Sequence, residues 1–394
     1  MMQKLKDYDF TLMISPILLT AFGLVMIYSA SMVVAVVEGH ESTHYFTRQL
    51  LWFGLGLIGF IICSIFPYKK YQKLMRWIVG IVVVLLLGLF VFGTTINNAK
   101  SWYVIGPVSF QPAEFAKIAL IMYLASVYSK KQSYLNQFYS AVLPPLVLTV
   151  FILGLIVVQP DIGTASIIFL IACSVIVSSG IRFKHLLLLI GVGVVILAFA
   201  IPNMVTDVRI SRFTGAYQPF EAPETSGYQL IQSYLAIGVG GLNGEGLGQS
   251  VQKLGYLMEA HTDFIMAIIA EELGFIGVVI VIGLLATIVL RGIFIARKCE
   301  DSFGALLAIG ISSMVGVQAF INLGAISGIL PITGVPLPFV SYGGSSLLVM
   351  LISMGILNNI AKTTRKNEQE NDVHTQEPQS KLTFQNRGGK TWVN

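Results

Sequence analysis

The stretch that decides the fold is EAHTDFIMAIIAEELG at residues 259–274, which continues directly into FIGVVIVIGLLATIVL at 275–290. The second part approaches the length of about 20 apolar residues at which a helix crosses a bilayer. Similar stretches recur along the 394-residue chain, which is 55% hydrophobic and only 11% charged, whereas a soluble protein carries about 25% charged residues. We therefore expect an all-α, polytopic membrane protein. Because the apolar stretches are continuous and do not alternate, an outer-membrane β-barrel is disfavoured.

Ten apolar stretches are candidates for membrane spans. They cover residues 10–37, 47–66, 75–95, 112–129, 141–158, 162–180, 185–203, 263–296, 304–327 and 345–362. Lys and Arg gather in the short loops on one side, together with the N-terminus, so the positive-inside rule places both termini in the cytoplasm. The membrane domain is expected to occupy residues 1–362, and the polar tail at 363–394 is expected to be disordered.

Three segments on the opposite, outer side are unusual. The first is a loop at 96–111, and the second is a large outer loop at 204–262, between spans seven and eight. Within that loop, YQLIQSYLAIGVGG at 228–241 has an amphipathic pattern that suits the membrane surface. The third is GILPITGVPLPFVSYGG at 328–344, where proline and glycine at membrane depth predict a re-entrant segment buried in protein.

Asp263 stands where the large outer loop meets span eight. It can be a cap in the first turn of a helix, favoured by the helix dipole, or a general base at the outer surface. These interpretations are compatible, because a dipole-stabilised carboxylate stays ionised. Glu259 could share a helical face with Asp263, and His261 either orients a neighbour or faces solvent.

Two further acids, Glu271 and Glu272, would lie about 12 Å below Asp263 in a straight helix. An unpaired carboxylate at that depth costs several kcal/mol, so at least one must face a cavity or a cation. Lys117 is the candidate cation. It follows Glu114 by three residues and shares its helical face, so an internal ion pair between these two is the alternative.

Other polar residues can be explained by structure or by function. Asp161 follows a proline at the start of span six and is either a helix cap or a site residue. Arg209 and Arg212 are on the outer side, where they could hold a pyrophosphate or make surface salt bridges. No GxxxxGK[ST] loop is present, so no ATP site drives the protein. The DxD pattern at 7–9 is interpreted as a solvated cytoplasmic stub.

Five motifs resemble the SEDS family (shape, elongation, division and sporulation). They are QPAEFAK at 111–117, QPDIGTA at 159–165, GYQLIQSYLAIGVGGLNGEGLGQSVQK at 227–253, EAHTDFIMAIIAEELG at 259–274 and TGVPLPFVSYGGSS at 333–346. The sequences of these motifs are most similar to the cell-division branch of the family, with the elongation and sporulation branches as alternatives. One departure is Met258, where many relatives carry proline.

The resemblance implies a peptidoglycan glycosyltransferase that polymerises lipid II into β-1,4 glycan strands on the outer face of the bacterial cytoplasmic membrane. It implies a class B penicillin-binding protein and other division proteins as partners, a place at the division septum, and no nucleic acid. The essential acid of the family falls on Asp263. Candidate substrate-binding residues are Glu114, Lys117, Asp161, Arg209, Arg212, Glu259, His261, Ser341, Gly343 and Gly344.

The implied substrate is an α-linked sugar pyrophosphate on a polyprenol and the product is β-linked, so we expect inversion. One base, Asp263, takes the proton of the acceptor 4-hydroxyl. Cations stabilise the departing pyrophosphate: Arg209, Arg212 or Lys117, with a divalent ion (Mg²⁺ or Mn²⁺) as a further candidate and no organic cofactor. The alternatives are a lipid II flippase, which buried charges and a broken segment would suit, and a scaffold that recruits a synthase.

Overall fold

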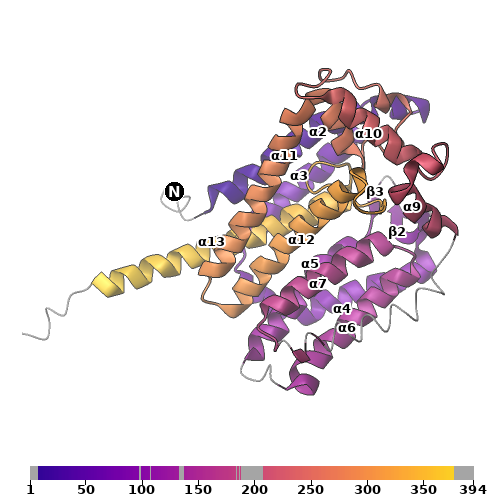
Figure 1. Cartoon of the computed structure of the whole chain (residues 1–394). Coiled ribbons are helices and arrows are strands. Elements are labelled where there is room, and N and C mark those ends of the chain that lie inside the picture. The colour runs from indigo at the N-terminus through magenta and orange to yellow at the C-terminus, as the bar shows by residue number, and fades with distance from the viewer. Residues whose placement is uncertain are drawn as a thin grey trace, which may run out of the picture.

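The computed structural model describes residues 8–96, 99–106, 108–132, 137–182, 184–185, 187 and 207–376. Most of these residues are helical, which confirms the predicted all-α fold class (Figure 1). The helices are α2 Phe10–Val37, α3 His44–Ile65, α4 Tyr68–Phe92, α5 Pro112–Lys130, α6 Leu143–Val158, α7 Ile162–Ser178, α9 Asp207–Tyr217, α10 Tyr228–Gly240, α11 Ile265–Lys298, α12 Ser302–Ile326 and α13 Gly344–Gln376. Short helical turns are η2 Phe138–Val142, η3 Pro219–Glu221 and η4 Gln252–Leu254.

The membrane character of these helices follows from their length and composition. Within the described residues, 7 helices are long and apolar enough to cross a membrane: α2, α3, α4, α6 with η2, α11, α12 and α13. The helix α7 is apolar but shorter. The predicted seventh span at 185–203 lies outside the described residues, apart from 185 and 187. The chain is therefore a multi-pass membrane protein, while the count of ten spans stays a prediction.

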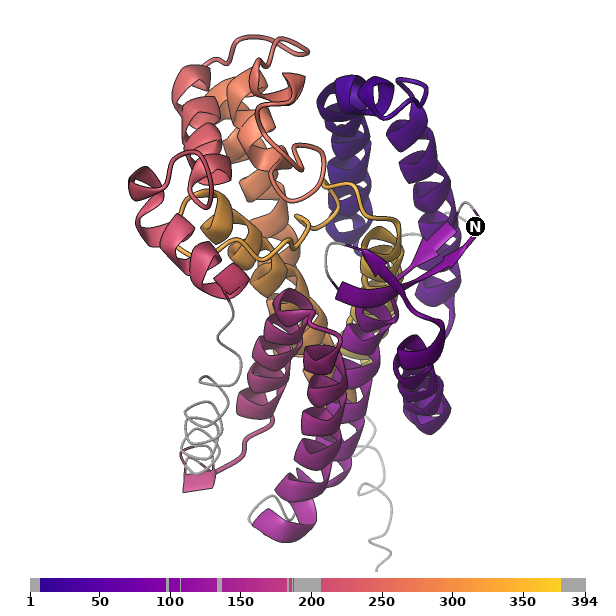
Figure 2. The ribbon, with the colours of Figure 1, turned by 90° about the vertical axis from the view of Figure 1, so that its right-hand side faces the viewer.

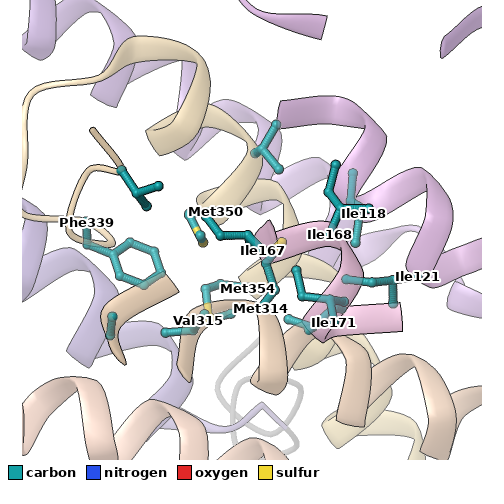
Figure 3. Packing of buried hydrophobic residues seen from close by; sticks show 14 of the residues in the cluster. Ile118, Ile121, Ile167, Ile168, Ile171, Met314, Val315, Phe339, Met350 and Met354 are labelled. Atoms are coloured by element: carbon teal, nitrogen blue, oxygen red, sulfur yellow. The ribbon is translucent and has the colours of Figure 1, made fainter. Parts of the chain in front are cut away.

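The helices pack around a common apolar core. The helix α11 packs along α2 and α12, α13 lies along α3, and α5 contacts α4, α7 and α12. Figure 3 shows the point where α5, α7, α12, α13 and the irregular segment before α13 meet. Its buried side chains include Ile118, Ile121, Ile167, Ile168, Ile171, Met314, Val315, Phe339, Met350 and Met354.

The prediction of an outer loop at 96–111 is wrong in part, because most of this segment forms a small antiparallel sheet. The strands are β1 Thr94–Ile96, β2 Ala99–Ile105 and β3 Val108–Phe110, in the order β1-β2-β3. Aromatic and β-branched residues dominate β2, and such residues favour a pleated, half-buried surface. The sheet joins the C-terminal end of α4, where the Tyr103 hydroxyl donates to the Leu85 carbonyl at 2.8 Å.

The prediction of a disordered tail from residue 363 is also wrong for 363–376, where α13 continues without a break. Its residues 365–370 include Arg, Lys, Gln and Glu, which are good helix formers, and they extend a helix already nucleated by packing. Ion pairs support it, from Lys298 to Glu368 at 3.0 Å and from Lys366 to Glu370 at 3.6 Å. Residues 377–394 lie outside the described part.

The expected solvated stub at 7–9 is wrong at Asp9, which is buried. Its carboxylate accepts from the Leu12 amide at 3.2 Å and caps α2, and it pairs with Arg291 of α11 at 2.7 Å. The start of α2 therefore lies beside the end of α11. The start of α11, with Asp263 just before it, is at the opposite end of the bundle.

The predicted continuous span at 263–296 is interrupted at Gly274, whose φ of 65° and ψ of −162° are not helical. The loop at 241–246 crosses α11 there and takes over its backbone hydrogen bonds. Phe275 N donates to Gly241 O at 2.9 Å, and Glu245 N donates to Glu271 O at 2.9 Å. The residues before the kink are almost all buried, whereas Phe275 just after it is 59% exposed. The lipid-facing part of α11 therefore begins after the kink.

Candidate functional site

The site is built around the turn that carries Asp263, where three distant parts of the chain meet. Asn322, near the end of α12, donates its side-chain amide to the Asp263 carbonyl at 2.7 Å and to the Val335 carbonyl at 2.8 Å. The Tyr342 amide donates to the His261 carbonyl at 3.0 Å. Figure 2 shows the segment before α13 running between α2 and α12. These bonds fix the backbone of Asp263 against that segment.

The Asp263 side chain is only partly exposed and shares the Thr262 hydroxyl with Glu259. That oxygen lies 2.6 Å from Glu259 Oε2 and 3.1 Å from Asp263 Oδ1. Burial, reinforced by the Glu259 charge, raises the pKa of Asp263 to about 7, against the opposing effects of Thr262 and the Arg212 charge. At neutral pH the group therefore exchanges a proton easily, as a general base must.

The interpretation of Asp263 as a helix cap is wrong. Phe264 occupies the N-cap position of α11, and no side chain caps the helix there. The chain turns before the helix begins, because Glu259 takes a positive φ of 55° and its carbonyl accepts from the Phe264 amide at 3.2 Å. The Asp263 carboxylate is thereby left available for other partners.

His261 is buried, so its interpretation as a solvated loop residue is wrong. It is 7% exposed, and its ring lies 4.4 Å from the Tyr45 ring and 5.7 Å from the Tyr342 ring. Burial lowers its pKa, opposed by the charges of Glu259 and Glu38. The ring is therefore neutral at neutral pH.

Glu114 and Lys117 form the predicted ion pair on one face of α5, at 2.7 Å and buried. Lys117 also donates to Gln318 Oε1 at 2.7 Å, and Gln318 donates to the Pro336 carbonyl at 3.0 Å. The motif at 111–117 is thereby joined through α12 to the segment before α13.

Asp161 is the predicted cap of α7, because its carboxylate accepts from the Thr164 amide at 3.1 Å. It also accepts from Gln111 Nε2 at 2.8 Å, and Gln111 N in turn donates to Ser345 Oγ at 3.2 Å. Three motifs far apart in sequence therefore converge, and substrate binding by Asp161 stays a prediction.

Lys117 is not the partner of the acids in α11, and that expectation is wrong. Glu272 pairs with Lys253 at 2.7 Å and accepts from Ser29 Oγ of α2 at 2.7 Å. Glu271 accepts from the Val251 amide at 2.8 Å. Sequence reasoning missed Lys253, although a lone lysine in an apolar outer stretch was a signal. These contacts form a latch, defined by Lys253, Glu271 and Glu272, between the outer loop and α11.

The glycine-rich turn at 341–344 is held by protein contacts. The Ser341 hydroxyl accepts from the Leu337 amide at 2.8 Å. Gln49 of α3 donates to the Ser341 carbonyl at 3.3 Å and accepts from the Gly343 amide at 3.2 Å. A Cβ on Gly344 would lie 2.1 Å from Nε1 of Trp52, so a side chain has no room there. Substrate binding by these three residues stays a prediction.

The two outer arginines lie on α9. Arg212 is exposed, and its charge reaches Asp263, whose pKa it lowers. The Arg209 side chain lies outside the described part of the structure. Among the described residues, no three His, Cys, Asp or Glu side chains come together in a way that could hold a metal ion. The donors of the described residues therefore do not fit a resident metal, and a divalent cation stays a prediction.

Comparison with known proteins shows which proteins this chain resembles. A family model described as cell cycle protein, which joins FtsW, RodA and SpoVE, matches residues 10–366. The probable peptidoglycan glycosyltransferase FtsW of Bacillus subtilis is 51% identical over 92% of this chain and 93% of that protein. Stage V sporulation protein E of the same organism is 41% identical over 91% of this chain and 97% of that protein. A solved chain of a peptidoglycan synthase complex that coordinates polymerization and crosslinking is 29% identical, with a TM-score of 0.74, over 91% of this chain and 98% of that chain.

Proposed function

Because this chain belongs to the family of cell cycle proteins that joins FtsW, RodA and SpoVE, we propose that it is a peptidoglycan glycosyltransferase. The substrate is lipid II and the product a β-1,4 glycan strand, made on the outer face of the cytoplasmic membrane. The single observation that carries the mechanism is the environment of Asp263. Its backbone is held in place, and its partly buried carboxylate has a pKa of about 7 and lies beside the outer loop.

In the proposed step, Asp263 takes the proton of the acceptor 4-hydroxyl while that oxygen attacks C1 of the donor sugar. The bond between C1 and the pyrophosphate oxygen breaks, and the electron pair leaves with the pyrophosphate. Arg212 is a described cation suited to that leaving group, because its side chain is exposed and its charge already acts on Asp263. Lys117 is committed to Glu114 and Gln318, which favours a structural role.

The assignment to cell division rests on the relatives. FtsW of B. subtilis is 51% identical, against 41% for the sporulation protein, which supports a place at the division septum with other division proteins. The peptidoglycan synthase complex supports a class B penicillin-binding protein as the partner that crosslinks the strands.

The test is polymerisation of lipid II in detergent by the purified protein with its partner. The wild type is expected to make glycan strands, and Asp263→Asn is expected to lower the rate by at least about a hundredfold, because a base contributes about 10²–10⁴. Asp301→Asn, at a cap on the opposite end of the bundle, is the control and should retain activity. Normal polymerisation by Asp263→Asn would refute the base assignment.

The polymerisation assay, together with a division assay in cells, separates the other candidate functions. Detergent removes the need for transport, so a flippase without polymerase activity would yield no strands. A scaffold would support division in cells with Asp263→Asn. Addition of a chelator tests the divalent cation, and a loss of rate that Mg²⁺ or Mn²⁺ restores would show that the substrate or the site recruits one.

A further inference from the structure

Aromatic rings from three separate segments meet directly beside Asp263. Tyr45 from the start of α3 lies 4.4 Å from His261, and Tyr342 from the turn before α13 lies 5.1 Å from Tyr45. The two tyrosine rings are nearly perpendicular, at 87°. Both tyrosines are partly exposed, whereas His261 beneath them is buried. The rings therefore form a small aromatic platform at the outer end of the bundle, defined by Tyr45, His261 and Tyr342.

The platform is connected to the proposed base. His261 is two residues before Asp263, in the turn that the Tyr342 amide holds. Glu259 is linked to both: it shares the Thr262 hydroxyl with Asp263, and its charge also acts on His261. The platform therefore adjoins the turn that carries the Asp263 carboxylate.

One polar atom of the platform has no partner. His261 Nδ1 is buried and makes no hydrogen bond to any described residue. A buried ring nitrogen without a partner costs free energy, which a ligand hydroxyl or amide could recover.

The charges around the platform select the ligand. Glu38 accepts from the Tyr45 hydroxyl, and Glu259 and Asp263 add two more carboxyl groups. Arg48 acts on Tyr342 and Arg212 acts on Asp263, so three carboxyl groups face two cations. Carboxylates in excess repel a pyrophosphate but accept hydrogen bonds from neutral hydroxyls. A sugar ring suits this surface, because the C–H groups of its apolar face pack on aromatic rings, whose faces carry partial negative charge.

We propose that Tyr45, His261 and Tyr342 form the subsite for the N-acetylglucosamine that presents its 4-hydroxyl to Asp263. The proposal rests on the glycosyltransferase function proposed above and deepens it by placing the neutral acceptor sugar, and not the donor pyrophosphate, at this end of the site.

The kinetic test compares variants in the lipid II polymerisation assay. Tyr342→Leu and Tyr45→Leu are each expected to raise the lipid II concentration for half-maximal rate by about tenfold, which corresponds to a loss of about 1.4 kcal/mol of binding free energy. The maximal rate should change much less. Tyr342→Phe keeps the ring and should restore most of the affinity. Tyr139→Leu, at an 82% exposed aromatic residue, is the matched control.

A binding test does not depend on turnover. The Asp263→Asn protein is titrated with the soluble β-1,4-linked disaccharide of N-acetylglucosamine and N-acetylmuramic acid, and contact is measured by saturation-transfer NMR. Binding is expected with Asp263→Asn alone and is expected to be lost when Tyr342→Leu is added. Thermal unfolding of each variant shows whether it is folded.

The outcomes separate the two proposals. The subsite would be overturned if both leucine variants kept the wild-type half-maximal concentration and Tyr342→Leu left disaccharide binding unchanged. That result would leave the proposed glycosyltransferase standing, because the wild type would still make strands. A wild-type protein that makes no strands with its partner would overturn the glycosyltransferase itself. A fall in maximal rate alone, with disaccharide binding unchanged, would also count against the subsite.

Discussion

At the scale of single residues, Asp263 shows a conflict between stability and function. Its carboxylate is surrounded by protein and stands near Glu259, so the ionised form is disfavoured in the folded state. A general base must nevertheless lose its proton at the working pH. The protein retains a group that costs stability when it is charged, which is the pattern expected of a reactive site and not of a helix cap.

This conflict predicts opposite effects of pH on activity and stability. The pKa of Asp263 is about 7 in the folded protein against an ordinary value of 3.8, so between these values the native state holds a proton that the unfolded chain has released. Stability therefore falls as the pH rises from about 4 to 7. Asp263→Asn should raise the unfolding temperature most above pH 7, and the gain should vanish near pH 4. Polymerisation by the wild type should instead fall as the pH drops below about 7.

The measurement is thermal unfolding in detergent at several pH values, together with the rate profile of the wild type. Glu224→Gln, at an exposed position of the outer loop, is the matched control. A stability gain from Asp263→Asn that is the same at every pH would contradict the buried carboxylate.

At the scale of elements, the kink in α11 frees backbone carbonyls that bind the outer loop. A continuous helix would use the carbonyls of Glu271 and Glu272 internally, whereas here they accept from Glu245 at 2.9 Å and Gly246 at 3.0 Å. The kink depends on the residue at 274, because a Cβ there would lie 2.4 Å from Gly244 N and 2.5 Å from Leu242 O. The loop and the helix determine each other's shape.

Gly274→Ala should therefore be severely destabilising, by roughly 3 kcal/mol or more, because it combines a backbone clash with a conformation that L side chains rarely adopt. Gly283→Ala in the same helix is the control. A Cβ at 283 meets nothing within 4 Å, and alanine is the better helix former. The measurement is the apparent free energy of unfolding in detergent, and equal effects of the two substitutions would show that the kink is not required.

In the latch, single substitutions are expected to cost more stability than the double substitution. Lys253→Met or Glu272→Gln alone should each cost about 3–5 kcal/mol, because the remaining partner is buried, with at most 2% of its side chain exposed. The double substitution removes both charges and should recover most of that loss. The exposed pair of Lys298 and Glu368 is the control, with an expected cost of at most about 1 kcal/mol. Additive single effects in the double variant would contradict the latch.

At the scale of the whole molecule, the packing places the proposed chemistry at one end of the bundle. Asp263 lies before α11, whereas Arg291 near the end of α11 pairs with Asp9 at the start of α2. The connection between α2 and α3 is therefore on the same side as Asp263, and the connection between α11 and α12 is on the opposite side. Under the proposed function lipid II presents its sugars outside the cell, so we predict that the Asp263 end faces outward.

This orientation can be tested by labelling with a membrane-impermeant maleimide. In a background with Cys63, Cys173 and Cys299 replaced, Ser42→Cys should react on intact cells. Glu300→Cys, between α11 and α12, should react only after the membrane is permeabilised. Reaction of Glu300→Cys on intact cells would reverse the proposed orientation and remove Asp263 from the outer face.

The membrane fold could be predicted from the sequence alone, because burial of apolar side chains in lipid requires only a local run of suitable residues. The sequence also offered the ion pair of Glu114 and Lys117 and the cap at Asp161 as alternatives that the structure shows, since both depend on spacing within one helix. Three features became visible only in the tertiary structure: the partner of Glu272, the kink at Gly274 and the environment of Asp263. Each of these depends on contacts between segments far apart in the chain, and periodicity along one helix carries no information about which distant segment will supply the charge, the carbonyl or the buried surface.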